Sequence, residues 1–124
     1  MVKQEDALDG IFGALASAVR RQTIVSLGAG ARTASELAAP HDMSLGGFMK
    51  HLRVLSDAGL VSCRKQGRTV TCTLARTPLS KASRWLASRE EALNLRLDAL
   101  GRHLYHQEQI KARRASPAPK KRSP

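Results

Sequence analysis

One stretch of the chain decides its fold: residues 43–74, with the sequence MSLGGFMKHLRVLSDAGLVSCRKQGRTVTCTL. Its first part predicts a helix that begins after a serine N-cap, Ser44, and ends at Gly59, the residue type preferred where a chain turns left-handed. The expected buried side of this helix consists of Leu45, Phe48, Leu52 and Leu55. A well-bounded amphipathic helix is therefore expected here.

After Gly59 the spacing of apolar residues changes from the helical period to a period of two. The alternating apolar residues are Val61, Cys63, Val70, Cys72 and Leu74. With a turn at Gln66 and Gly67, this pattern predicts a two-stranded hairpin with one apolar face. Both cysteines fall on that face, so we expect small core residues and not redox or metal-binding groups.

Three further helices are predicted before this stretch, over about residues 5–16, 18–27 and 34–39. The first has apolar residues at i, i+3, i+4 and i+7, namely Leu8, Ile11, Phe12 and Leu15. Ser17 is a candidate N-cap for the second, and Thr33 with Glu36 forms a capping box for the third. The expected architecture is thus mainly α with a small β-hairpin: a winged helix-turn-helix of about five to six helices plus a two-stranded wing.

A long helical stretch follows Pro78, over about residues 79–110. Leucines recur in it at near-heptad spacing: Leu86, Leu93, Leu97, Leu100 and Leu104. Such an apolar seam requires a partner surface. We therefore expect one domain, residues 1–111, followed by a basic disordered tail, residues 112–124.

Charge favours a polyanionic partner. The chain of 124 residues carries a formal net charge of +11, and the body remains basic without the tail, which contains no acidic residue. No apolar run is long enough to span a membrane, and the N-terminus lacks the basic start of a signal peptide, so we expect a cytoplasmic protein without a membrane partner.

In a winged helix-turn-helix, the second helix of the motif enters the major groove of DNA and the wing contacts the backbone or minor groove. The helix after Ser44 offers small and cationic residues, and the hairpin tip RKQGR offers long cations. The predicted DNA-binding residues are Thr33, Ser35, Ser44, Leu45, Gly46, Gly47, Met49, Lys50, His51, Arg53, Arg64, Lys65, Gln66 and Arg68. Glycines near a helix start are either tolerated there or permit close approach to DNA.

Three runs resemble the ArsR/SmtB family of winged-helix repressors: FGALASAVRRQTIVSL, TASELA and the stretch 43–74. The resemblance covers about residues 8–106. It implies a homodimer, joined through the first and last helices, that binds a palindromic operator in double-stranded DNA and represses transcription. The implied dimer interface comprises Leu8, Ile11, Phe12, Leu15, Leu86, Leu93, Leu97, Leu100 and Leu104.

Many members of that family sense metals, through a cysteine pair in the third helix or through acidic and histidine ligands on the last helix. The expected third helix, ASELAA, has no cysteine. His103 and His106 could form half of a zinc site with Asp98 or Glu108, completed by a dimer mate, but their spacing does not match the family pattern. We therefore expect no metal and no cofactor, and leave open an unknown effector.

An enzyme is not expected, because no nucleophile is paired with a base and the carboxylates are scattered. Besides a sequence-specific repressor, three alternatives remain. They are a nonspecific or architectural DNA-binding protein, a zinc-type responsive repressor that uses the histidines of the last helix, and a protein-interaction module.

Overall fold

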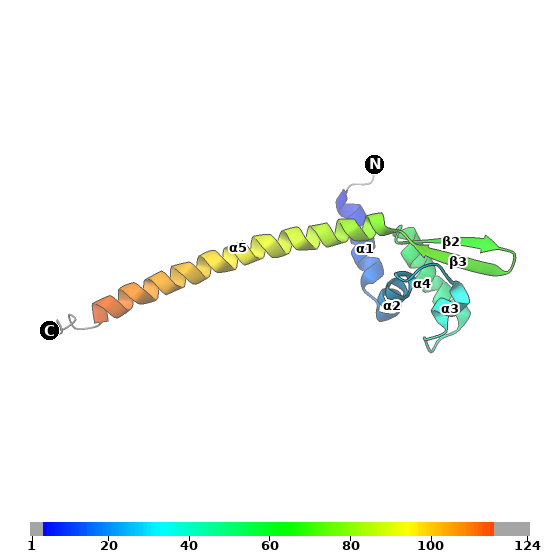
Figure 1. Cartoon of the computed structure of the whole chain (residues 1–124), viewed down its shortest axis with the longest axis horizontal. Helices are drawn as coiled ribbons and strands as arrows, with labels where there is room; N and C mark the ends of the chain where they lie inside the picture. Colours follow the sequence, from blue (N-terminus) through cyan, green and yellow to red (C-terminus); the bar gives the residue numbers. More distant parts are fainter. Residues whose placement is uncertain (1–3, 116–124) are drawn as a thin grey trace. The chain divides into compact units, whose positions relative to one another are not determined.

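The computed structural model describes residues 4–115, which contain five helices and three strands (Figure 1). In chain order these are α1 (Gln4–Leu15), α2 (Ala18–Leu27), β1 (Arg32–Thr33), α3 (Ala34–Ala38), α4 (Leu45–Asp57), β2 (Val61–Gln66), β3 (Thr69–Leu74) and α5 (Arg76–Ala115). The mainly α architecture with a hairpin after the fourth helix is confirmed. Within residues 4–115, no helix combines the length and apolar character needed to cross a bilayer.

The chain forms two compact units, Met1–Trp85 and Leu86–Pro124. The first unit holds α1–α4, the sheet and the start of α5. Its core is apolar and draws on every one of these elements. The buried residues are Ile11, Ala14, Leu27, Ala34, Leu37, Phe48, Leu52, Leu55, Leu60, Val61, Cys72 and Ala82.

Local capping explains where the helices of the first unit begin. Ser17 accepts a hydrogen bond from the Arg20 backbone N–H, and Thr33 forms the expected capping box with Glu36, with both hydrogen bonds at 3.1 Å. The hydrogen bond from the Thr33 backbone N–H to the Glu36 carboxylate is the largest cause that lowers the pKa of Glu36 from its ordinary value. The predicted helix starts are confirmed at both positions.

The end of α4 is a Schellman motif. Gly59 has φ +75°, its N–H donates to the Ser56 carbonyl at 2.9 Å, and the Leu60 N–H donates to the Leu55 carbonyl at 3.0 Å. Glycine reaches this left-handed conformation without a steric penalty. The predicted stop at Gly59 is confirmed, and Leu60 is carried directly into the core.

The sheet differs from the prediction in two ways. It has three antiparallel strands in the order β1-β3-β2, because the two residues of β1 pair with β3. Gln66 pairs with Thr69, so the turn lies at Gly67 and Arg68, one residue later than expected. Gly67, with φ +61°, is the residue that makes this turn possible.

Two expectations about buried side chains are wrong. Leu45 lies in the first turn of α4 with 50% of its surface exposed, because the core begins one turn later at Phe48. Cys63 is exposed, since only Val61 at the start of β2 reaches the core. Ile11, which the resemblance placed at the dimer interface, is 2% exposed in the core of the first unit.

Helix α5 extends beyond its predicted limits at both ends. It begins at Arg76 and includes Pro78 in its first turn, where the missing N–H costs no intrahelical bond. It continues through Ala115, so residues 112–115 are helical although we expected a disordered tail from residue 112. The rest of the predicted tail, residues 116–124, lies outside the described residues.

Candidate nucleic-acid interface

Helix α4 presents a fixed apolar face inward and a polar, cationic face outward. Phe48 and Leu55 are fully buried, and together with Leu52 they hold the helix against the core. The opposite face exposes Lys50 and Arg53 and more than a third of Met49. Because side chains three to four residues apart lie on one face of a helix, the outward groups form a continuous strip.

The N-terminus of α4 is capped and otherwise open. The Ser44 hydroxyl accepts a hydrogen bond from the Gly47 N–H at 3.0 Å, which leaves its own O–H free to donate. A Cβ on Gly46 would meet no atom within 4 Å, whereas one on Gly47 would lie 3.2 Å from the Ser44 hydroxyl. Packing inside the monomer therefore gives no reason for glycine at position 46.

The turn that leads into α4, residues 39–44, is held by a contact to that helix. Within the turn, the His41 ring stacks on Phe48 with centroids 5.7 Å apart. At the opposite end of α3, the Thr33 hydroxyl caps the start of the helix, and Ser35 is exposed one residue into it. Two helices joined by such a short turn are typical of a helix-turn-helix.

His51 is anchored by a residue that the sequence analysis did not single out. Arg20 Nη1 lies 2.9 Å from His51 Nδ1, and the same guanidinium donates to the carbonyls of Ala14 at 2.6 Å and Gly13 at 3.2 Å. Since arginine only donates, Nδ1 must accept, and the ring proton sits on Nε2. One feature of the sequence could have indicated this role of Arg20: the last turn of α1 has no basic residue of its own, and its carbonyls need hydrogen-bond donors.

The wing residues are all exposed, but they do not share one face. Register pairs Arg64 with Thr71 and Lys65 with Val70, so Arg64 and Lys65 point to opposite sides of the hairpin. Gln66 lies on the side of Arg64, and Arg68 occupies the turn itself. The hairpin projects from the α1–α4 cluster as a wing, with its tip at these residues (Figure 1).

A groove of about 520 Å³ joins the helix to the wing. Met49, Lys50 and Arg53 line it from α4, and Cys63 lines it from β2. The described residues 4–115 contain one ion pair, between Arg32 and Glu36 at 3.8 Å, and it involves none of the cations of α4 or the wing. One carboxylate, Asp57, also lines the groove, but it is not ion-paired with these cations, so they remain available to a phosphate backbone.

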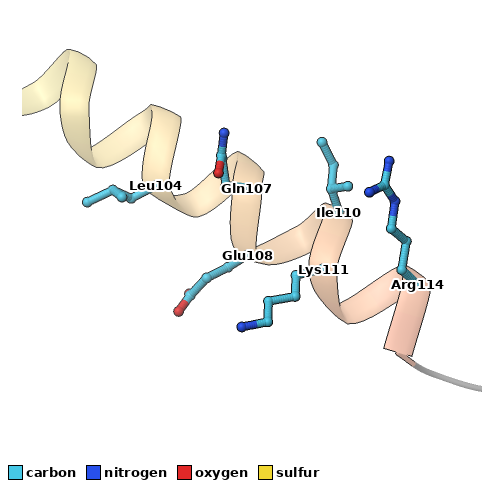
Figure 2. A pocket seen from close by; sticks show the side chains of 6 residues that line it. All are labelled: Leu104, Gln107, Glu108, Ile110, Lys111 and Arg114. Carbon is cyan, nitrogen blue, oxygen red and sulfur yellow. The ribbon is translucent and has the colours of Figure 1, made fainter.

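The second unit exposes the leucine seam. Leu86, Leu93, Leu97, Leu100 and Leu104 are each between 51% and 56% exposed. Figure 2 shows the end of α5, where the side chains of Leu104, Gln107, Glu108, Ile110, Lys111 and Arg114 project from a single helix. All six residues that line this space belong to α5, so it is an open surface of the helix.

His103 and His106 lie on this exposed helix. In the described part of the chain, no three histidine, cysteine or acidic side chains converge as metal ligands. A zinc site at these histidines would need ligands from a second chain.

Comparisons with known proteins agree with this geometry. A model of a family described as "Helix-turn-helix domain" matches residues 10–64. A crystal structure of an ArsR family transcriptional regulator shares 41% identity, covers 76% of this chain and 97% of its own, and superposes with a TM-score of 0.70. An ArsR-like transcriptional regulator from Rhodococcus sp. RHA1 shares 30% identity, with coverage of 82% and 95% and a TM-score of 0.66.

A third similar structure is described as a possible transcriptional regulator for arsenical resistance. It shares 33% identity, covers 69% of this chain and 92% of its own, and has a TM-score of 0.60. The search of curated proteins found no match. With more than 90% of each of these related structures matched, the chain belongs to the ArsR family of winged helix-turn-helix transcriptional regulators.

Proposed function

We propose that this protein is a homodimeric repressor that binds a palindromic operator in double-stranded DNA and does so without a metal. The observation that carries the proposal is the cationic surface of α4 and the wing, whose lysine and arginine side chains form no ion pair among the described residues. The DNA-binding residues proposed are those predicted from the sequence, with α4 in the major groove and Arg64, Lys65, Gln66 and Arg68 at the backbone.

Within this surface the residues have different roles. Gly46, Met49 and Lys50 are exposed early in α4, where a recognition helix faces base edges, and Arg53 lies a turn later, toward phosphate. Ser44 and Thr33 use their hydroxyl oxygens as caps and retain O–H donors for phosphate. His51 has only Nε2–H left to offer, because Arg20 occupies Nδ1.

Dimerisation is supported by the seam of the second unit. Leu93, Leu97, Leu100 and Leu104 follow the 4-3-4 spacing of seam positions in a heptad, and each is more than half exposed in the single chain. Five exposed leucines in one stripe make an apolar surface that a second copy would cover. Two recognition helices would then reach successive major grooves about 34 Å apart.

Metal independence rests on the ligands. The third helix has no cysteine, and within one chain His103 and His106 find no third ligand among the described residues. One similar protein is described as a possible regulator for arsenical resistance, so zinc and arsenite are both worth titrating. Saturable heat at one or two zinc ions per dimer would favour the alternative of a zinc-type responsive repressor.

The experiment that tests the proposal is a competition assay. A labelled duplex from the DNA upstream of the protein's own gene is bound at physiological salt, and bulk DNA is added as competitor. A sequence-specific regulator should prefer its site by at least about 10³-fold. Equal competition by bulk DNA would instead support the architectural alternative.

Lys50→Ala should weaken operator binding by about 5- to 150-fold, the range expected for a lost base contact of about 1–3 kcal/mol. Arg102→Ala is the matched control. This substitution also removes one positive charge, but at an outer heptad position of α5, away from the leucine seam. Unchanged affinity of the Lys50 variant would contradict the assignment of α4 as the recognition helix. Loss of binding in both variants would point to charge alone.

A further inference from the structure

The two cysteines of the chain face each other across the wing. The loop between β2 and β3 has two residues, so the flanking pair Gln66 and Thr69 is hydrogen-bonded and the pairs then alternate. Counting back along the ladder, Cys63 and Cys72 form a non-hydrogen-bonded pair. In such pairs the Cα atoms are about 4.5 Å apart and the side chains are at their closest.

That separation is suited to a disulfide, which spans Cα atoms about 4.4–6.8 Å apart. Directly opposite residues also point to the same side of a sheet, so the two thiols leave the hairpin on one face. The predicted turn at Gln66 and Gly67 would have opposed Cys63 to Val70. The observed register is what brings the two cysteines together.

The two thiols have different environments. Cys72 is 0% exposed, whereas Cys63 is exposed in the groove beside Lys50 and Arg53. Burial, and then a hydrogen bond with the Cys63 side chain, raises the pKa of Cys72 to about 12. The accessible thiol of the pair is therefore Cys63.

We propose that Cys63 and Cys72 form a reversible cross-strand disulfide, and that hydroperoxides are the oxidants. The exposed Cys63 thiolate attacks the peroxide O–O bond, which gives the sulfenic acid and releases hydroxide, or alkoxide from an organic peroxide. The Cys72 sulfur then attacks the Cys63 sulfur, the S–O bond breaks, and water leaves with the Cys72 proton. Both electrons lost by the thiol pair are taken up by the peroxide.

The raised pKa of Cys72 sets the kinetics of the second step. The thiolate is the nucleophile in such exchanges, and a group with a pKa of about 12 is almost entirely protonated at neutral pH. Ring closure should therefore accelerate as pH rises from 7 to 9. Cys63 sulfenic acid, once formed, should persist longer at the lower pH.

A consequence for DNA binding rests on the proposed function. The link ties β2 to β3 only one residue before Arg64, at the start of the cationic tip, and moves the Cys63 sulfur relative to the groove that Lys50 and Arg53 line. Because neighbouring strands are twisted relative to one another, a covalent tie changes the local twist. The orientation of the cationic tip relative to α4 then changes, and we expect operator affinity to fall at least threefold.

The test treats the full chain with hydrogen peroxide and separates disulfide formation from DNA binding. Intact mass should fall by two hydrogens, and peptide mapping should find the Cys63–Cys72 link in the wild type. Cys63→Ser should form no link, and dithiothreitol should restore both mass and affinity. Cys72→Ala is a second variant, with a dimedone adduct expected at Cys63; circular dichroism confirms its folding.

Absence of the link, or links only between chains, would overturn the proposal. A link that leaves operator affinity unchanged would overturn its regulatory consequence. If the reduced protein binds no DNA, the proposed function fails on its own, while the mass measurement still decides whether the disulfide forms.

Discussion

Gly46→Ala should make the protein more stable and a weaker DNA binder. Gly46 is helical and exposed in the first turn of α4, and a Cβ there meets no atom within 4 Å. No steric cost therefore opposes the gain in helix preference. Replacing glycine by alanine at a compatible position stabilises by about 0.4–1 kcal/mol, so Tm should rise by roughly 2–8 °C for a unit of this size.

The effect on DNA binding has the opposite sign if the backbone of α4 approaches DNA closely. One methyl group forced into a packed contact costs about 1–3 kcal/mol, which corresponds to about 5- to 150-fold in Kd. Thermal unfolding by circular dichroism and fluorescence anisotropy with the operator duplex measure the two effects on one preparation. Opposite signs cannot come from damage to the fold.

Two other glycines provide controls. Gly10 in α1 also has open space around its missing Cβ, so Gly10→Ala should raise Tm without changing Kd. Gly47→Ala places a Cβ 3.2 Å from the Ser44 hydroxyl and should gain little or no stability. If Gly46→Ala binds operator as tightly as the wild type, glycine at this position is merely tolerated, and the close-approach explanation is refuted.

Three further predictions concern the wing, the leucine seam and the stability of the fold at acidic pH. Arg68→Ala should weaken binding to all DNA sequences equally and lower the slope of log K against log salt by about one; a sequence-dependent loss would indicate base contact. Leu97→Glu should yield monomers in sedimentation, whereas Leu95→Glu, at the outer heptad position, should not; two unchanged dimers would move the interface elsewhere. Because the pKa of Glu36 is lowered in the folded state, its contribution is present above about pH 4.5 and is lost as pH falls through the folded value. Glu36→Gln should therefore lose less stability on acidification, and parallel unfolding curves would contradict the capping contribution.

The parts of the fold that the sequence predicted correctly are those fixed by neighbours in the chain. Ser44, Thr33 and Gly59 each act within five residues of their own position, through a cap or a left-handed turn. The third strand was missed because two residues carry no periodicity, and β1 exists only by pairing with β3. The one-residue error in the turn arose because both placements put a glycine in the turn.

The candidate site was less predictable wherever it depends on contacts distant in sequence. Arg20 and His51 are 31 residues apart, and no local pattern pairs them. The stripe in α1 was correctly identified as apolar, but periodicity does not say whether a stripe faces the core or a partner. Ile11 faces the core, while Phe12 packs edge-on against Trp85 at 5.6 Å.

The connection between α4 and the wing, which form the two halves of the proposed DNA surface, is only two residues long. Gly59 ends α4, and Leu60 is fully buried and accepts a hydrogen bond from the Ala75 N–H at 2.8 Å, just beyond β3. A side chain at position 59 would require the left-handed conformation, which costs other residues about 1–2 kcal/mol. The angle between α4 and the wing is therefore set by one glycine and one buried leucine. The position of the wing relative to α4 therefore depends on the packing of the core. Because this connection is short and buried, a change in hairpin twist caused by a Cys63–Cys72 link should move the wing tip relative to α4.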